Sequence, residues 1–572
     1  MVFFRRFGLV AIFSSISAIG GLSCTHSLTS KFFAPSGDEQ SAEKVISGET
    51  MLESIRKLSS DEFEGRSPGS AGEELTVNYL IQEYKRLGLK PGNPDGTFVQ
   101  KVPLVGATTE YKANFENHGH RSVLIANKDI VATSHQLVSG VEVKQSELIF
   151  VGYGVVAPEF GWDDYKDVDV RGKTLVMLVN DPQIPDPLNP NQLDERMFKG
   201  NAMTYYGRWT YKYEIAAKKG AAAAILIHET SAAGYPFEVV INSWGREVFD
   251  TESADLNQGR TKVEAWIANE KARTLFKECG QDFDTLKKAA LSRNFRPIAL
   301  GTKFNISLKR NQRKIFSRNV IGKIDGADSS PGHRYLVYSA HWDHFGRDPK
   351  LTGDQIFHGA LDNASGVAAL LETAKAFKAL TAAPKSTILF IATTAEERGL
   401  LGAHYYAQHP LYPLSRTLAD LNFDGVTVDG RTHEQSLVGK GSTTLEGQLA
   451  QILEASGRKL VPEDDPEKGM YYRTDQFEFS KAGVPSLTYI SGIDFVGKPA
   501  SFGIQRRDAY IAHDYHKVSD VIKPDWDLSG AVEDVQVFFR LGYQIAEEPR
   551  WPSWLPGAEF GAIRSASEND RK

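Results

Sequence analysis

The chain has 572 residues, which is more than one compact hydrophobic core usually holds, so two or more domains are expected. Hydrophobic residues make up 41% of the chain and charged residues 24%, which are ordinary values for a globular protein. The 66 basic and 72 acidic residues give a net charge of -6, and this argues against a nucleic-acid-binding protein, which would usually carry a basic excess. The two cysteines, Cys24 and Cys279, exclude a disulfide scaffold.

The first 24 residues have the pattern of a secretory signal peptide. Arg5 and Arg6 precede a short apolar run over residues 7–19. This run is shorter than the ~20 apolar residues that a membrane-spanning helix needs. Cys24 resembles the acylated cysteine of bacterial lipoproteins, although Gly21 stands where that pattern has a large aliphatic residue. We therefore expect an exported protein that is periplasmic, secreted or an outer-membrane lipoprotein, with lipidation and simple cleavage both left open.

The next part of the chain predicts a linker followed by two helices. Residues 25–47 are polar and mixed in character, which favours a linker or a loosely ordered arm. Apolar residues then recur at helical spacing over 51–58 and again over 75–87, where Gly88 is a natural stop.

The middle of the chain, from about residue 132 to residue 297, has a different composition pattern. Residues 147–151, 174–179 and 221–228 predict strands, and residues 211–219 predict a helix. This pattern indicates a separate small domain.

The last part alternates strands with helices. Apolar runs at 335–340 and 386–394 predict strands, and the segments 364–380 and 443–456 predict helices. Such alternation implies a sheet that is covered by helices on both faces. Functional sites in these sheets collect at the strand ends.

Histidine and acidic residues lie just beyond the predicted strands or in loops. Each one alone is more often a helix cap or an exposed loop residue than a catalytic group. Together they supply the nitrogen and oxygen ligands that zinc accepts. The set is His341, Asp343, Asp362, Glu396, Glu397, Asp424 and His516.

Two pairs in this set invite a more detailed prediction. If the extended geometry persists, His341 and Asp343 point the same way, so the Asp343 carboxylate is placed to accept the second ring N–H of His341. Glu396 and Glu397 are adjacent and therefore point to opposite sides. One carboxylate can then bind a metal while the other reaches the solvent or the substrate.

Five motifs resemble those of the two-zinc aminopeptidase family, which also includes glutamate carboxypeptidases, glutaminyl cyclases and inactive transferrin receptors. They are HWDH at 341–344, GALDNASG at 359–366, AEE at 395–397, NFDG at 422–425 and YH at 515–516. The resemblance implies a three-layer α/β/α peptidase domain with a central mixed sheet and an inserted, mainly-β protease-associated domain. The expected divisions are a signal peptide at 1–24, a linker at 25–47, peptidase segments at 48–131 and 306–550, the insertion at 132–305, and a C-terminal tail at 551–572.

The resemblance also implies roles for individual residues. One zinc ion would be held by His341, Asp362 and Asp424. The second of two zinc ions per chain would be held by Glu397, His516 and the shared Asp362. Glu396 would be the general base, Asp343 would sit behind His341, and Tyr515 would polarise the scissile carbonyl. Gln476 stands where the family usually has a histidine, so no role of that histidine is transferred.

The resemblance thus predicts an exopeptidase acting on a peptide substrate, with an aminopeptidase favoured. A carboxypeptidase would need arginines for a substrate carboxylate, for which Arg473, Arg506 and Arg507 are candidates. A glutaminyl cyclase and a catalytically inactive receptor-like protein are also left open by the motifs. No nucleic acid is expected as a partner, membrane contact is expected only through a lipid on Cys24, and a homodimer is left open.

Overall fold

The structure is a computed structural model that describes residues 37–328, 330, 333–439 and 441–571. The fold described below is that of the compact unit Pro35–Lys572. The expected signal peptide and the lipidation site at Cys24 lie outside the described residues. Within the described part of the chain, every helix is too short or too polar to cross a bilayer.

The C-terminal part of the chain builds a mixed sheet whose parallel strands end at one edge. Strand β13 (Tyr335–His341) lies between β16 (Thr387–Thr393) and β17 (Thr417–Asn422) and runs parallel to both. Strand β20 (Ser486–Thr488) continues the parallel set, whereas β12 (Ile298–Ile324) pairs with β16 in the antiparallel sense. The carboxyl ends of β13, β16 and β17 therefore meet, which is where ligands bind in open α/β sheets.

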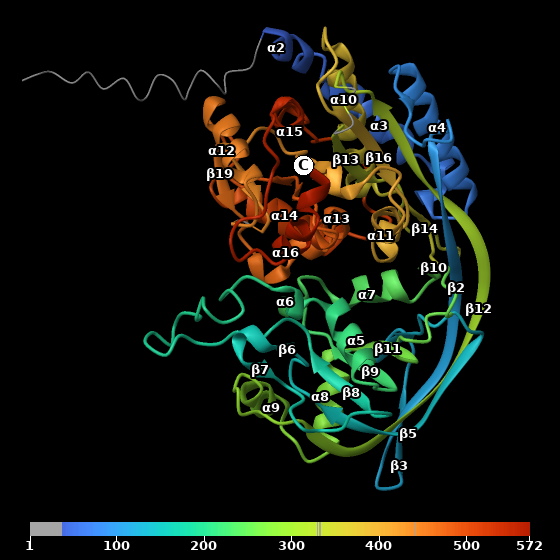
Figure 1. Cartoon of the computed structure of the whole chain (residues 1–572). Helices are drawn as coiled ribbons and strands as arrows, with labels where there is room; N and C mark the ends of the chain where they lie inside the picture. The colour runs from blue at the N-terminus through green and yellow to red at the C-terminus, as the bar shows by residue number, and fades with distance from the viewer. Residues whose placement is uncertain (1–36, 329, 331–332, 440, 572) are drawn as a thin grey trace, which may run out of the picture. The chain divides into compact units, whose positions relative to one another are not determined.

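Helices cover both faces of this sheet (Figure 1). Leu336 and Tyr338 on β13 belong to the core formed with α3 (Gly48–Leu58), α10 (Gly366–Ala379) and α15 (Ser529–Glu547). Val337 points the other way, as alternation along a strand requires, and packs in a core with Ala403 on α11 (Leu401–Gln408) and Phe479 on α13 (Gln476–Lys481). The predicted α/β class with a central mixed sheet is confirmed.

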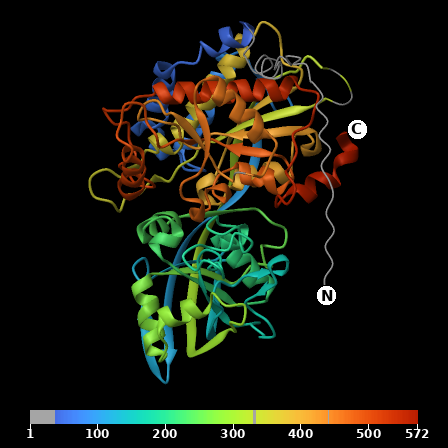
Figure 2. The ribbon, with the colours of Figure 1, turned by 90° about the vertical axis from the view of Figure 1, so that its left-hand side faces the viewer.

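Two long strands join this sheet to the middle of the chain. Strand β2 (Val99–Asn117) pairs with β12 in the antiparallel sense from Val99↔Val320 to Glu116↔Lys303, and the two are seen running together in Figures 1 and 2. On its other edge β12 pairs with β5 (Gly140–Phe150). The predicted division between residues 305 and 306 thus falls inside a continuous strand, because no proline or turn interrupts β12 there.

The middle of the chain has its own hydrophobic cores. Strands β8 (Thr174–Leu178), β9 (Ala223–Ile227) and β11 (Val263–Ile267) are parallel to one another. Parallel neighbouring strands need crossover connections. Helix α5 (Trp209–Lys218) lies between β8 and β9 in the chain, and helix α8 (Asn269–Glu278) follows β11. We call residues 132–305 the inserted segment.

Two predicted boundaries need correction. Residues 37–47 are not a linker, because they contain helix α2 (Gly37–Glu43) and bury Ala42 and Ile46 in the C-terminal core. At the other end, the expected tail contains α16 (Gly561–Ala566), whose buried Arg564 donates a 2.9 Å hydrogen bond to the Thr417 carbonyl. Both segments are short and amphipathic. Only a few of their apolar or long side chains pack against the core, and composition alone does not predict such packing.

Candidate metal centre

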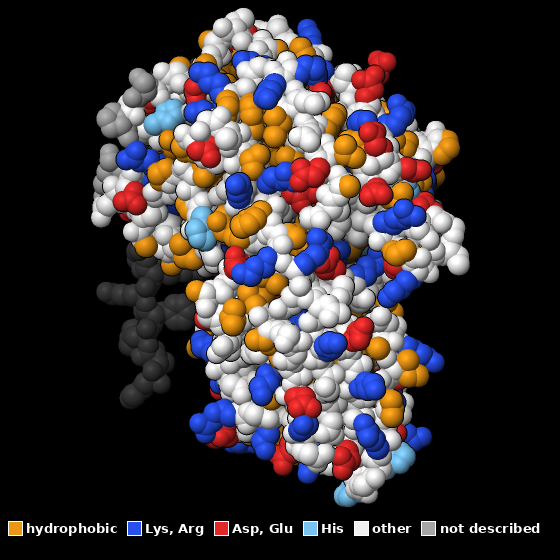
Figure 3. Space-filling view, turned by 90° about the vertical axis from the view of Figure 1, so that its right-hand side faces the viewer, with side chains coloured by type: hydrophobic (Ala, Val, Ile, Leu, Met, Phe, Trp, Pro, Cys, Tyr) orange, Lys and Arg blue, Asp and Glu red, His pale blue; other side chains and the backbone are white. Residues whose placement is uncertain are grey.

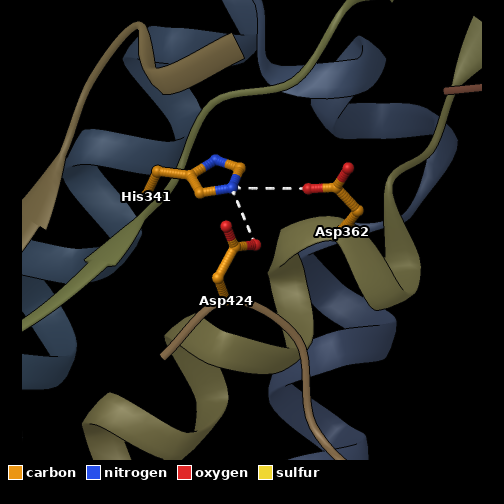
Figure 4. Close-up of side chains that lie close together, drawn as sticks. All are labelled: His341, Asp362 and Asp424. Atoms are coloured by element: carbon orange, nitrogen blue, oxygen red, sulfur yellow. Dashed lines mark hydrogen bonds and ion pairs between the residues drawn. The ribbon is translucent and has the colours of Figure 1, made fainter. Parts of the chain in front are cut away.

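The first group of donor side chains gathers at the ends of β13 and β17. His341 is the last residue of β13, Asp424 follows β17, and Asp362 lies in the turn Ala360–Ser365 before α10. The Nε2 atom of His341 is 3.3 Å from Asp362 Oδ1 and 3.4 Å from Asp424 Oδ1 (Figure 4). The structure therefore brings these three predicted ligands together, with His341 buried.

The second group lies on the other side of Asp362. His516 Nε2 is 3.3 Å from Asp362 Oδ2 and 3.1 Å from Glu397 Oε2. The two oxygens of Asp362 thus face two different histidines, as expected for a carboxylate that bridges two metal ions. The sequence separates these residues widely, but the sheet topology places all five predicted ligands in one cluster.

Glu396 faces the first group while Glu397 faces the second. They are the first two residues of the turn Glu396–Arg398, which follows β16 in the chain. Ala395, just before the turn, has a left-handed φ of 54°. Glu396 Oε2 lies 3.7 Å from His341 Nε2, whereas Glu397 contacts His516. These contacts show that the two adjacent carboxylates point in different directions, as predicted.

Asp343 contacts the centre differently from the sequence-based prediction. The Nδ1 atom of His341 is 3.8 Å from the Asp343 carboxylate, which is too long for a hydrogen bond, and 3.2 Å from the Asp343 backbone carbonyl. The carboxylate instead accepts a 3.0 Å hydrogen bond from the backbone N–H of Glu396. Strand β13 ends at His341, so the side-chain alternation of an extended strand cannot be assumed at Asp343.

His344 is a neighbour of the centre that the sequence analysis did not single out. It is fully buried, and its Nδ1 atom lies 2.5 Å from Glu397 Oε1. With Asp362 and Glu397 it forms a second set of donor atoms close enough to share one cation. The sequence signal that could have identified His344 is its position as the second histidine of the HWDH motif.

Residues 319–539 match the sequence model of peptidase family M28, and this segment contains every candidate residue described so far. We call residues 319–539, which match this family model, the M28 domain. Among curated proteins, it is 40% identical over 102 residues to "Probable zinc metalloprotease" of Pyrenophora tritici-repentis, a match that covers 17% of this chain and 22% of that protein. It is 30% identical over 180 residues to "Aminopeptidase YwaD" of Bacillus subtilis, covering 31% of this chain and 36% of that protein.

These matches span well under half the length of either curated relative. Among solved structures, the fold is similar to that titled "Aminopeptidase from Aneurinibacillus sp. strain AM-1", with a TM-score of 0.49 and 19% identity, covering 91% of this chain and 97% of that one.

The electrostatics of the M28 domain fit a cationic occupant. Burial raises the pKa of Glu396 well above its usual value, and the neighbouring carboxylates of Asp424 and Glu397 add to that effect. Burial would lower the pKa of His341, but Glu396, Asp362 and Asp424 together raise it well above its ordinary value. The Nε2 atom of His344 is buried without a hydrogen-bond partner. Crowded carboxylates and orphaned donor atoms are what a divalent cation satisfies.

Helix α7 (Phe237–Trp244) of the inserted segment contacts the second group directly. Asn242 Nδ2 donates to the backbone carbonyl of His516 at 3.2 Å, and Ser243 Oγ is 3.4 Å from the Nδ1 atom of the same histidine. The partly buried Arg398 side chain donates to the Ser243 carbonyl at 3.0 Å. The inserted segment thus helps to orient a predicted ligand of the M28 domain, a role that no local sequence pattern indicated.

Tyr515 lies at the wall of the centre. Its ring stacks on that of His516 with centroids 3.8 Å apart, and its hydroxyl accepts a 3.2 Å hydrogen bond from Arg473. Burial raises the pKa of Tyr515 above its usual value, so the phenol stays protonated and can donate. Gln476 is buried and bonded to the Tyr471 carbonyl at 2.9 Å, so it serves the local turn.

Two cavities meet at the centre. One of 310 Å³ is lined by Asp362, Asp424 and a largely apolar wall that includes Ile490 and Ile511. The other, of 650 Å³, lies between the M28 domain and the inserted segment. Glu396, Arg473 and Tyr515 border both cavities, so a substrate could extend to either side of Glu396.

Proposed function

We propose that the protein is an exported zinc-dependent exopeptidase, and specifically an aminopeptidase that releases N-terminal residues with Glu396 as the general base. The observation that carries the proposal is the convergence of two histidines and two further carboxylates on Asp362, beside the buried carboxylate of Glu396. The printed names of the similar proteins, a zinc metalloprotease and an aminopeptidase, support the same class of reaction.

We assign the donors to two zinc ions. His341 and Asp424 would share one ion with Asp362, and Glu397 and His516 would share the other. The donor set fits zinc because it consists of imidazole nitrogens and carboxylate oxygens, all within a few ångströms of the two oxygens of Asp362. When bound, the ions would lower the pKa of a water molecule and polarise the scissile carbonyl.

The side chains of the protein then move the proton and orient the substrate. Glu396 takes a proton from the attacking water and passes it to the leaving amine. The Asp343 carboxylate supports this group through its hydrogen bond to the Glu396 backbone N–H. The protonated Tyr515 hydroxyl donates to the oxygen of the scissile carbonyl, where negative charge develops.

The arginines named for a carboxypeptidase are mostly occupied. Arg506 pairs with Asp429 at 2.6 Å and Arg507 pairs with Asp465 at 2.8 Å. Neither guanidinium is therefore free to hold a substrate C-terminus. This pairing favours the aminopeptidase over a carboxypeptidase that relies on all three arginines.

Further assignments rest on the sequence pattern. We propose that residues 1–24 direct export, with or without a lipid on Cys24, and that the inserted segment is a protease-associated domain that shapes access to the centre. A homodimer stays a prediction. On the face shown in Figure 3, basic and acidic side chains are interspersed.

The test compares the two ends of the substrate. Purified zinc-loaded protein should release 4-nitroaniline from aminoacyl-4-nitroanilides, and a chelator should abolish the release. Cleavage of N-blocked peptides with acidic C-termini in place of free N-termini would show a carboxypeptidase. Cyclisation of N-terminal glutamine without release of a residue would show a glutaminyl cyclase, and absence of both metal and turnover would show a receptor-like protein.

A further inference from the structure

An arginine from the N-terminal part of the chain is buried beside the centre. Arg66 is the last residue of the short helical turn Asp61–Arg66, and it is only 1% exposed. Among the described residues, its guanidinium donates hydrogen bonds to backbone carbonyls. One of these bonds, 2.7 Å long, goes to the Leu58 carbonyl at the end of α3 and anchors the side chain. The other three reach the M28 domain.

The three remaining bonds join two loops that carry predicted metal ligands. Nε donates at 2.9 Å to the carbonyl of Trp342, the residue directly after His341. Nη1 and Nη2 donate at 2.7 and 2.9 Å to the carbonyls of His358 and Gly359, shortly before Asp362. A planar guanidinium fixes the relative directions of its donors, so it holds the two loops at a set separation. We call these hydrogen bonds the Arg66 clamp.

The backbone that presents this side chain is held in an unfavourable conformation. Glu64 and Arg66 have left-handed φ values of 46° and 53°, a region that is costly for residues with a Cβ atom. Gly65 between them has a φ of 66°, and a Cβ there would lie 2.5 Å from the Phe357 carbonyl oxygen. Such conformations persist only where the surrounding structure enforces them, and they cluster at functional sites. The turn therefore places Arg66 against the two loops at a conformational cost.

The guanidinium stays charged although it is buried. Burial lowers the pKa of Arg66 to about 10, so the group is protonated at neutral pH. The lowering is opposed by four carboxylates near the centre, those of Asp520, Asp362, Asp343 and Glu397. Hydrogen bonds from an ionised donor are shorter and stronger than those from a neutral one. The charge therefore strengthens the hold of the Arg66 clamp on both loops.

We propose that Arg66 is a positioning residue of the metal centre, because the Arg66 clamp ties the loop after β13 to the segment before α10 and so fixes the spacing of His341 and Asp362. These two predicted ligands come from separate segments of the chain (Figure 4). The inference rests on the proposed zinc centre and adds to it a residue that is not itself a ligand. Loss of the clamp should weaken metal binding and change the metal geometry while every ligand stays in the chain.

The experiment measures zinc retention in two Arg66 variants. Arg66→Met removes all four hydrogen bonds, whereas Arg66→Lys keeps the charge on a single nitrogen that lacks the planar fork. Both variants should retain zinc about 10- to 100-fold more weakly than the wild type against a competing chelator, the usual effect of losing a group that supports metal ligands. Wild-type retention by Arg66→Lys would show that charge alone suffices, and wild-type retention by Arg66→Met would show that neither matters. Either result would overturn the proposal.

A second buried arginine is the matched control. Arg564 donates at 3.2 and 2.9 Å to the carbonyls of Leu414 and Thr417, at the opposite end of β17 from Asp424. Arg564→Met should lower the Tm, as Arg66→Met should, but keep wild-type zinc retention. Should Arg66→Met fail to fold, Arg66→Lys supplies the comparison. An equal loss of zinc in the Arg564 and Arg66 variants would show a general structural role and overturn the proposal.

The absorption spectrum of cobalt-loaded protein reports the metal geometry directly. Its visible bands should shift in both Arg66 variants and stay unchanged in Arg564→Met. Unchanged bands in the Arg66 variants would overturn the positioning role, while the peptidase function would stand. A wild type that binds zinc but cleaves no peptide would overturn the peptidase function alone, since zinc retention is compared without turnover. A wild type that binds no zinc would overturn both.

Discussion

The backbone N–H of Glu396 donates a 3.0 Å hydrogen bond to the carboxylate of Asp343. Both residues follow the ends of neighbouring parallel strands, β16 and β13, so the bond links two separate loops. Asp343 is fully buried and its second oxygen has no hydrogen-bond partner. This geometry makes Asp343 a positioning residue for the proposed base.

Variants of Asp343 separate hydrogen bonding from charge. Asp343→Asn keeps an oxygen that can accept from the Glu396 N–H, whereas Asp343→Ala leaves that buried N–H without a partner. We expect kcat of Asp343→Ala to fall at least about 10-fold below that of Asp343→Asn, in line with the effect of losing an outer partner of a metal site. Zinc content measured on both variants is the control. Equal losses of kcat in the two variants would mean that the charge, and not the hydrogen bond, is what matters.

Replacement of Glu396 should separate metal binding from turnover. Glu396→Gln keeps the shape of the side chain but cannot accept the proton of the attacking water. We expect kcat to fall about 10²- to 10⁴-fold, the usual contribution of a general base, while the zinc content stays at the wild-type level. A zinc-loaded Glu396→Gln protein with normal turnover would exclude Glu396 as the base.

The contact of the inserted segment with His516 has a measurable consequence. Ser243→Ala removes the hydroxyl that lies 3.4 Å from His516 Nδ1. We expect about a 10-fold weaker retention of zinc against a competing chelator, because groups that orient a ligating imidazole strengthen metal binding. Ser231→Ala, at an exposed site on α6 (Thr230–Ala233), should leave retention unchanged. If both variants release zinc like the wild type, α7 does not support the centre.

The pKa of Glu463 predicts a pH-dependent stability. Burial raises the pKa of this carboxyl to about 7, although a hydrogen bond from the Gly439 N–H opposes the shift. Between pH 4.5 and 7 the folded protein keeps this proton while the unfolded chain releases it, so stability falls as the pH rises through this range. The loss amounts to roughly 3.5 kcal/mol at most, since one pKa unit corresponds to ~1.4 kcal/mol.

Glu463→Gln removes this titration while its side-chain oxygen can still accept from Gly439. The Tm of the variant should exceed that of the wild type at about pH 8 and match it more closely at about pH 4.5, as measured by thermal unfolding at both values. A difference in Tm that is the same at both pH values would show that Glu463 does not titrate in this range.

The regular elements of the M28 domain could be predicted from the sequence because their signals are local. The apolar run at 335–340 became β13 and the run at 386–394 became β16, each within a residue or two. The candidate ligands could be proposed for a related reason, since each belongs to a short motif near a strand end or in a loop. Strand pairing in the sheet brings the motifs together, and the sequence indicated this pairing only through the family resemblance.

Features that depend on distant contacts could not be predicted. Ser243 and His516 meet only because the inserted segment folds back on the M28 domain, and no spacing rule connects them. The expected hydrogen bond between the Asp343 carboxylate and the His341 ring is absent, because strand alternation was extended past the end of β13.

The most direct test of the account is the zinc stoichiometry of chelator-stripped protein after reconstitution, measured by elemental analysis on the wild type and on Asp362→Ala. The wild type should retain two zinc ions per chain. Asp362→Ala should retain less than one, because both groups of donors share this carboxylate. A wild type that binds no zinc, or an Asp362→Ala variant that still holds two ions, would contradict the bridged centre on which the proposed reaction depends.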